Sequence, residues 1–120
     1  MESKLFEENH FHFIGIGGIG MSAIAVALLK KGFSVSGSDL IQNDQTLTLK
    51  DMGATIFNTQ AEKNIDEIQA KYPNKELIIV LSSAIKKDNK EFIFSNQKKL
   101  PVKHRSEILS FVMQTYNSIG

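Results

Sequence analysis

The chain has 120 residues, of which 42% are hydrophobic and 22% are charged, and its net charge is +1 at pH 7. These values favour one globular domain and argue against a nucleic-acid-binding surface, while the absence of cysteine excludes disulfides and thiolate chemistry. No apolar run approaches the ~18 residues that span a bilayer and no secretion signal is evident at the N-terminus, so we expect a cytoplasmic protein without a membrane partner.

The first three predicted elements form a strand, helix, strand unit. Residues 11–16 are an apolar run that ends near glycine, which predicts a buried strand. Residues 19–29 are apolar nearly all round and rich in alanine and leucine, which predicts a buried helix capped by Gly32. Residues 33–38 predict a second strand that closes at Asp39.

The alternation of strands and helices continues to the end of the chain. Further helices are predicted at 45–52, 61–71, 89–98 and 106–115, and further strands at 55–57, 76–81 and around Val102. The ELIIVL run at 76–81 is typical of a strand buried on both faces of a parallel sheet. Because parallel strands need crossover connections, the pattern predicts a single α/β domain with a parallel sheet of about five strands flanked by helices.

A glycine motif lies where the first predicted strand meets the first predicted helix. Gly15-x-Gly17-x-x-Gly20 is followed by Asp39, nineteen residues after the last glycine. In this setting the first glycine permits a tight turn, the second lets a diphosphate approach the backbone, and the third lets the helix pack on the strand. Free N–H groups in the first helical turn favour an anion, and an aspartate at this place can bind a ribose. The spacing predicts a nucleotide site, although it fits NAD equally well and a tight turn without a ligand is also compatible.

Longer stretches of the chain resemble the N-terminal domain of the Mur ligases. The similar stretches are HFIGIGGIGMSAIA from residue 12, SGSD at 36–39, GA at 53–54, SSAI at 82–85 and PVKHRSEIL at 101–109, in the family's order. Within the family, GIGGIGMS resembles the branch that joins L-alanine to UDP-N-acetylmuramic acid in peptidoglycan synthesis. The resemblance implies that residues 1–120 form a Rossmann-like domain that binds the UDP part of this substrate, and that the central ATPase domain and the C-terminal domain are absent from the chain.

The resemblance also implies where the substrate lies. The loop from Gly15 to Ser22 would lie by the diphosphate, Asp39 by the uridine, and the SSAI segment would form another wall. The expected substrate-binding residues are Gly15, Gly17, Gly18, Ile19, Gly20, Met21, Ser22, Asp39, Ser82, Ser83, Ala84 and Ile85. Ligands of open parallel sheets do bind at the carboxyl ends of the strands, although serines that merely cap a helix would give the same SSAI pattern.

The sequence does not predict catalysis by this chain alone. No Walker A pattern, G-x-x-x-x-G-K-[ST], occurs in it. The resemblance implies that the full-length parent uses ATP and Mg²⁺ to form an acyl phosphate on the substrate, which the amine of L-alanine then attacks. We expect the chain to bind the nucleotide sugar weakly, to hold no cofactor and to contain no catalytic residue. The alternative interpretation is an NAD(P)-binding module of a dehydrogenase or a regulatory protein.

Some polar side chains have no assigned role. His10 and His12 share one face of the predicted strand, but no third ligand is evident, so no metal site is predicted. His12 matches a family histidine that supports the glycine turn. Thr-Gln at 59–60 stands where the family usually has Gly-His. Arg105 and Glu107 match the family's Arg-x-Glu, which positions the last helix against the next domain or touches the ligand.

Overall fold

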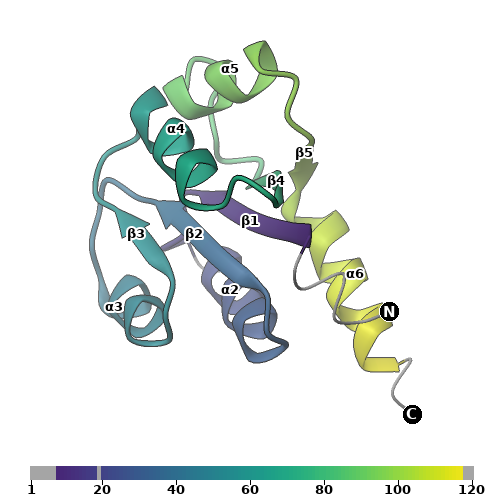
Figure 1. The fold of residues 1–120 in the computed structure, drawn as a ribbon. Helices are drawn as coiled ribbons and strands as arrows, with labels where there is room; N and C mark the ends of the chain where they lie inside the picture. Colours follow the sequence, from purple (N-terminus) through teal and green to yellow (C-terminus); the bar gives the residue numbers. More distant parts are fainter. Residues whose placement is uncertain (1–7, 19, 118–120) are drawn as a thin grey trace.

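The computed structural model describes residues 8–18 and 20–117. The elements are β1 (Asn9–Ile14), α2 (Met21–Lys30), β2 (Ser34–Ser38), α3 (Asp44–Asp51), β3 (Thr55–Phe57), α4 (Glu62–Lys71), β4 (Glu76–Leu81), α5 (Lys90–Gln97), β5 (Val102–His104) and α6 (Arg105–Asn117) (Figure 1). In this part of the chain five strands form one sheet in the order β3-β2-β1-β4-β5, and all neighbouring strands are parallel. The predicted α/β fold is therefore confirmed.

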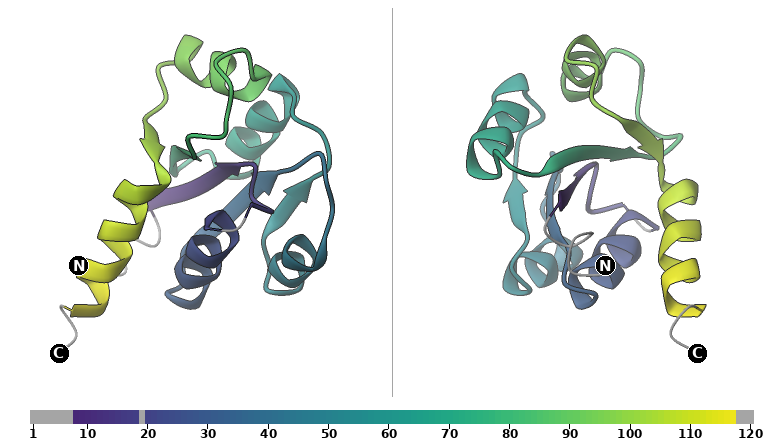
Figure 2. Two further views of the ribbon diagram at one scale, coloured as in Figure 1. Left: turned by 180° about the vertical axis from the view of Figure 1, so that it is seen from behind. Right: turned by 45° about the vertical axis from the view of Figure 1, so that its right-hand side comes forward.

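Helices cover both faces of the sheet. α2, α3 and α6 lie on one face, and α4 and α5 lie on the other (Figures 1 and 2). Because successive side chains of a strand point to opposite faces, Phe11 and Phe13 of β1 face α2, whereas His10, His12 and Ile14 face α4 and α5. The two faces of β1 thus separate an apolar side from a partly polar one.

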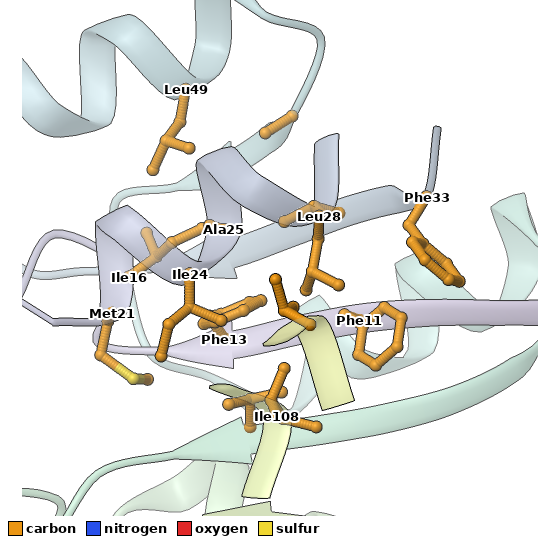
Figure 3. Close-up of a cluster of buried hydrophobic side chains, with 14 residues drawn as sticks. Phe11, Phe13, Ile16, Met21, Ile24, Ala25, Leu28, Phe33, Leu49 and Ile108 are labelled. Carbon is orange, nitrogen blue, oxygen red and sulfur yellow. The ribbon is translucent and has the colours of Figure 1, made fainter. Parts of the chain in front are cut away.

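The larger core lies between the sheet and α2. Figure 3 shows Phe11 and Phe13 of β1 beneath Ile24 and Leu28 of α2, with Ile108 of α6 closing the cluster from another side. All five side chains are buried, and Val26, Ala27 and Leu29 of α2 are partly buried against the same cluster, so apolar side chains pack on more than one face of this helix. This packing fixes the position of α2. We call the segment between β1 and α2, residues 15–20, the glycine loop.

The boundaries of the first two elements differ from the prediction. β1 ends at Ile14, two residues earlier than expected, because Gly15 turns the chain with a φ of 82°. α2 begins at Met21, and the preceding Gly20 is its N-terminal boundary residue. The intervening loop follows the carboxyl end of β1. Since every strand is parallel, the loops after β2, β3 and β4 lie at this same edge of the sheet.

Among the helices within residues 8–18 and 20–117, none has both the length and the apolar character needed to cross a bilayer. The longest helix, α6, has 13 residues, which at 1.5 Å per residue falls well short of the ~30 Å hydrocarbon layer.

Candidate functional site

A cavity of about 440 Å³ opens at the carboxyl edge of the sheet. It brings together the loops after β1, β2 and β4 and the first residue of α6. Its lining residues are Gly15, Gly18, Gly20, Met21, Asp39, Ser82, Ala84, Ile85 and Arg105. Eight of these nine were predicted as substrate-binding residues from the sequence, and the cavity brings together segments that lie far apart along the chain, from Gly15 to Arg105.

The other predicted site residues are placed differently. Gly17, Ser22 and Ser83 are not among the residues that line this cavity. Ser22 lies instead on a second hollow between α2 and α3, together with Asp44 and other residues of the two helices. Ser83 is exposed in the loop after β4. Ile19, also predicted, lies outside the described residues.

Gly15 makes the turn that starts the glycine loop. Its N–H donates to the carbonyl oxygen of Ser38 at 2.8 Å, and its φ of 82° is a conformation that other residues rarely adopt. A Cβ added here would lie 3.2 Å from Cδ1 of Ile85. The first glycine of the motif therefore serves both the turn and the close approach of the loop after β4.

Asp39 holds the glycine loop through the backbone of Gly17. The Gly17 N–H donates to Oδ2 of Asp39 at 2.8 Å, and the Ile41 N–H donates to Oδ1 at 3.0 Å. A Cβ at Gly17 would lie 2.9 Å from the same Oδ2 and 3.1 Å from Cγ2 of Thr46. Side chains of the domain itself thus fill the space where a Cβ at Gly17 would lie, and the approach of a diphosphate to this backbone stays a prediction.

Arg105 supplies a positive charge to the cavity. A Cβ at Gly20 would lie 3.0 Å from Nη1 of Arg105, so this glycine leaves room for a guanidinium. The start of α6 is fixed by Glu107, whose Oε2 accepts the His104 N–H at 2.9 Å. The sequence left open whether Arg105 and Glu107 meet a ligand or another domain. In the structure Arg105 lines the cavity and Glu107 caps the helix that carries it.

A buried hydrogen-bond network occupies the α4 and α5 face of the sheet. We call it the buried polar network, and its members are Ser34, His10, Ser36, His12, Glu91, Ser38 and Asn64. Ser36 Oγ lies 2.8 Å from Nε2 of His10 and 2.7 Å from Nδ1 of His12. Nε2 of His12 in turn lies 2.6 Å from Oε1 of Glu91. Among the described residues no group of three or more His, Cys, Asp or Glu side chains is arranged to hold a metal ion.

The sequences of β1 and β2 contain a pattern from which part of this network could be predicted. Ser34, Ser36 and Ser38 alternate along β2 and face the same side as the histidines of β1, with Ser36 opposite His12 in the register. Glu91 gave no such signal, because a glutamate in the first turn of a helix is usually exposed. It is fully buried here.

The environment of His10 makes it a neutral histidine. Burial, and then electrostatic interactions with His12, Lys75 and Lys71, lower the pKa of His10 from 6.5 to about 3. The ring also stacks on Tyr72 at the end of α4, with ring centroids 4.4 Å apart. The folded domain therefore resists protonation of this ring at pH values where the unfolded chain accepts a proton.

We expect this difference to make the domain less stable in mild acid. Since the unfolded state binds the extra proton below about pH 6.5, His10 should lower the free energy of unfolding by up to about 1.4 kcal/mol per pH unit down to about pH 3. Urea denaturation at about pH 7 and about pH 4.5 can compare the wild type with His10→Asn. The variant should lose less stability between the two pH values, and equal losses would contradict this role of His10.

The parallel sheet with helices on both faces is a Rossmann-like α/β fold, and comparisons with known proteins show the family. Residues 10–117 match the family described as "Mur ligase family, catalytic domain", so the chain belongs to the Mur ligase family. Over 120 residues the chain is 57% identical to UDP-N-acetylmuramate–L-alanine ligase of Prochlorococcus marinus subsp. pastoris, covering 100% of this chain and 25% of that protein. The ligase of the same name from Thermosynechococcus vestitus is 45% identical over 116 residues, covering 96% of this chain and 24% of the relative.

Solved structures give the same picture. UDP-N-acetylmuramate-alanine ligase of Thermotoga maritima matches with a TM-score of 0.72 and 25% identity, covering 88% of this chain and 23% of that one. A murein peptide ligase of Psychrobacter arcticus matches with a TM-score of 0.73 at 23% identity, over 85% of this chain and 20% of that one, which shows a shared fold. The chain thus spans about a quarter of the length of the curated relatives it matches.

Proposed function

We propose that this chain is the N-terminal, nucleotide-sugar-binding domain of an ATP-dependent ligase that joins L-alanine to UDP-N-acetylmuramic acid in peptidoglycan synthesis. The observation that carries the proposal is the cavity at the carboxyl edge of the sheet, lined by the glycine loop, Asp39, the segment after β4 and Arg105. Identity of 57% along the whole chain to a UDP-N-acetylmuramate–L-alanine ligase supports the choice of substrate.

The charges of the cavity favour a particular orientation of the substrate. The diphosphate lies against Gly18 and Gly20, where the positive end of the α2 dipole and the Arg105 guanidinium both attract an anion. The uridine lies toward Asp39, whose oxygens each accept one backbone N–H and keep a free lone pair for a further donor. Ile85 supplies an apolar wall of the cavity beside the turn at Gly15.

We assign phosphoryl transfer and amide formation to other domains of the proposed full-length ligase. The chain has no Walker A sequence, and the described residues offer no cluster of metal-ligating side chains. The residues present thus do not fit a site for ATP and Mg²⁺. In this proposal ATP, Mg²⁺ and L-alanine bind other domains, and this domain binds and orients the nucleotide sugar without catalysing a reaction.

Calorimetry and thermal denaturation of the chain test the proposal. We expect UDP-N-acetylmuramic acid to bind and to raise the melting temperature, by an amount equivalent to about 2.7 kcal/mol at a concentration 100 times its Kd. NADH at the same concentration should have no effect. Stabilisation by NADH without stabilisation by the nucleotide sugar would contradict the proposal and favour the dehydrogenase or regulatory alternative.

A further inference from the structure

The carboxylate of Glu91 is a meeting point for several segments at the carboxyl edge of the sheet. It is completely buried in the first turn of α5. Oε1 lies 2.6 Å from Nε2 of His12 and accepts the Ser38 hydroxyl at 3.0 Å. Oε2 accepts the backbone N–H of Ala61 at 3.2 Å and the side-chain amide of Asn64 at 3.1 Å. One carboxylate therefore joins β1, the end of β2, the loop before α4, and α4 itself.

Ser38 connects this carboxylate to the glycine loop and to Asp39. Its hydroxyl donates to Glu91, while its carbonyl oxygen accepts the N–H groups of Gly15 and Ile16 at 2.8 and 3.0 Å. The next residue, Asp39, lines the cavity and holds the glycine loop from its other side. A displacement of Ser38 would thus move two of the cavity walls together.

The loop after β4 is also connected to Glu91. Oδ1 of Asn89 accepts the N–H groups of Glu91 and Phe92 at 3.0 and 3.2 Å, which caps α5 where that loop ends. The Asn89 amide donates to Oε1 of Gln60 at 2.9 Å, in the loop whose Ala61 N–H reaches Glu91. The loops after β2, β3 and β4 therefore share one anchor.

We propose that Glu91 is a positioning residue for the cavity: through Ser38 it sets where Asp39 and the glycine loop stand, although it touches no ligand itself. A charged group buried in a core is a weak source of stability, since well-packed apolar side chains often do as well or better. The four donors to the Glu91 carboxylate come from four segments of the chain, and together they fix how these segments lie relative to one another. A preformed nucleotide site requires such fixed positions. This inference rests on the proposed function only for the ligand used in its test.

The test compares Ser38→Ala with Ser95→Ala. Ser38→Ala removes one donor to the Glu91 carboxylate and leaves the other three. Ser95 is equally buried, and its hydroxyl donates to the backbone carbonyl of Glu91 at 2.7 Å, so Ser95→Ala is a matched control that leaves the carboxylate contacts intact. Glu91→Gln is the stronger variant, since its NH2 group replaces one of the two acceptor oxygens and so faces two of the four donors, either His12 and Ser38 or Ala61 and Asn64.

Two readouts separate positioning from stability. We expect Ser38→Ala to weaken the affinity for UDP-N-acetylmuramic acid at least fivefold and Glu91→Gln at least tenfold, with Ser95→Ala within twofold of the wild type. In the unliganded protein, native-state hydrogen exchange of the Gly17 amide, which donates to Asp39, should be at least fivefold faster in Ser38→Ala than in Ser95→Ala.

The outcomes are distinguishable from failure of the proposed function. If the wild type does not bind the nucleotide sugar, the proposed function fails, and Gly17 exchange still decides whether Glu91 positions the loop. If Ser38→Ala lowers only the melting temperature, with affinity and Gly17 exchange matching Ser95→Ala, the positioning role is overturned. If Glu91→Gln does not fold, the comparison of Ser38→Ala with Ser95→Ala decides whether Glu91 positions the cavity.

Discussion

His12→Leu is expected to lower the free energy of unfolding by about 1–3 kcal/mol, the cost of leaving a buried hydrogen-bonding group without its partner. Nε2 of His12 is 2.6 Å from Glu91, and both side chains are 0% exposed. Without the ring, the carboxylate stays buried with one partner fewer and Ser36 loses a hydrogen bond. Because a domain of this size has about 5–15 kcal/mol of stability in all, urea denaturation should show a large fall in the midpoint.

The double variant His12→Leu/Glu91→Leu is the control for this prediction. Together with the Glu91→Leu single variant it completes a double-mutant cycle: because His12 and Glu91 are in contact, the loss in the double variant should be smaller than the sum of the two single losses. A loss below about 1 kcal/mol for His12→Leu would contradict the importance of the pair. If Glu91 positions the cavity, the double variant should also bind the nucleotide sugar more weakly than the wild type.

Arg105→Ala is expected to weaken the binding of UDP-N-acetylmuramic acid by about tenfold or more, since hydrogen bonds to charged groups contribute about 1.5–3 kcal/mol. The guanidinium lies beside Gly20 in the cavity, where the diphosphate is proposed to lie. Stability should change little, because Arg105 is only partly buried at the start of α6. Arg105→Lys should fall between the wild type and Arg105→Ala, since lysine keeps the charge but not the planar fork.

Lys103→Ala is the matched control for the charge. Lys103 is an exposed residue of β5 and lines a different cavity, which also contains Phe11, Pro101 and Phe111. The variant loses the same unit of positive charge without changing the proposed diphosphate site. We expect its affinity, measured by calorimetry, to stay within about twofold of the wild type at physiological salt. Equal losses in Arg105→Ala and Lys103→Ala would show that only the general field of the domain attracts the ligand.

The parts of the structure that the sequence predicted depend on local patterns. The alternation of apolar runs and helical segments was sufficient for the parallel sheet, because each parallel connection needs a crossover. The turn at Gly15 was also predictable, since its positive φ suits glycine. The segment after β4 could be placed beside it because strands of a parallel sheet end at one edge.

The missed features depend on contacts between distant residues. His12 and Glu91 are 79 positions apart, and no local pattern marks a glutamate in a helical first turn as buried. At Gly17 the motif correctly indicated a close approach, but glycine spacing does not tell which atoms approach. They belong to Asp39 and Thr46 of the domain itself. At Gly20 the approaching group is Arg105, a side chain that the sequence left unassigned.

A crystal structure of the chain with UDP-N-acetylmuramic acid tests the central claim most directly, which is that the cavity at the carboxyl edge binds the nucleotide sugar. The account predicts the diphosphate beside Gly18, Gly20 and Arg105, and the uridine toward Asp39. Density for the ligand in the cavity around Phe111, or well-diffracting crystals grown at saturating ligand with this edge of the sheet accessible and empty, would contradict it.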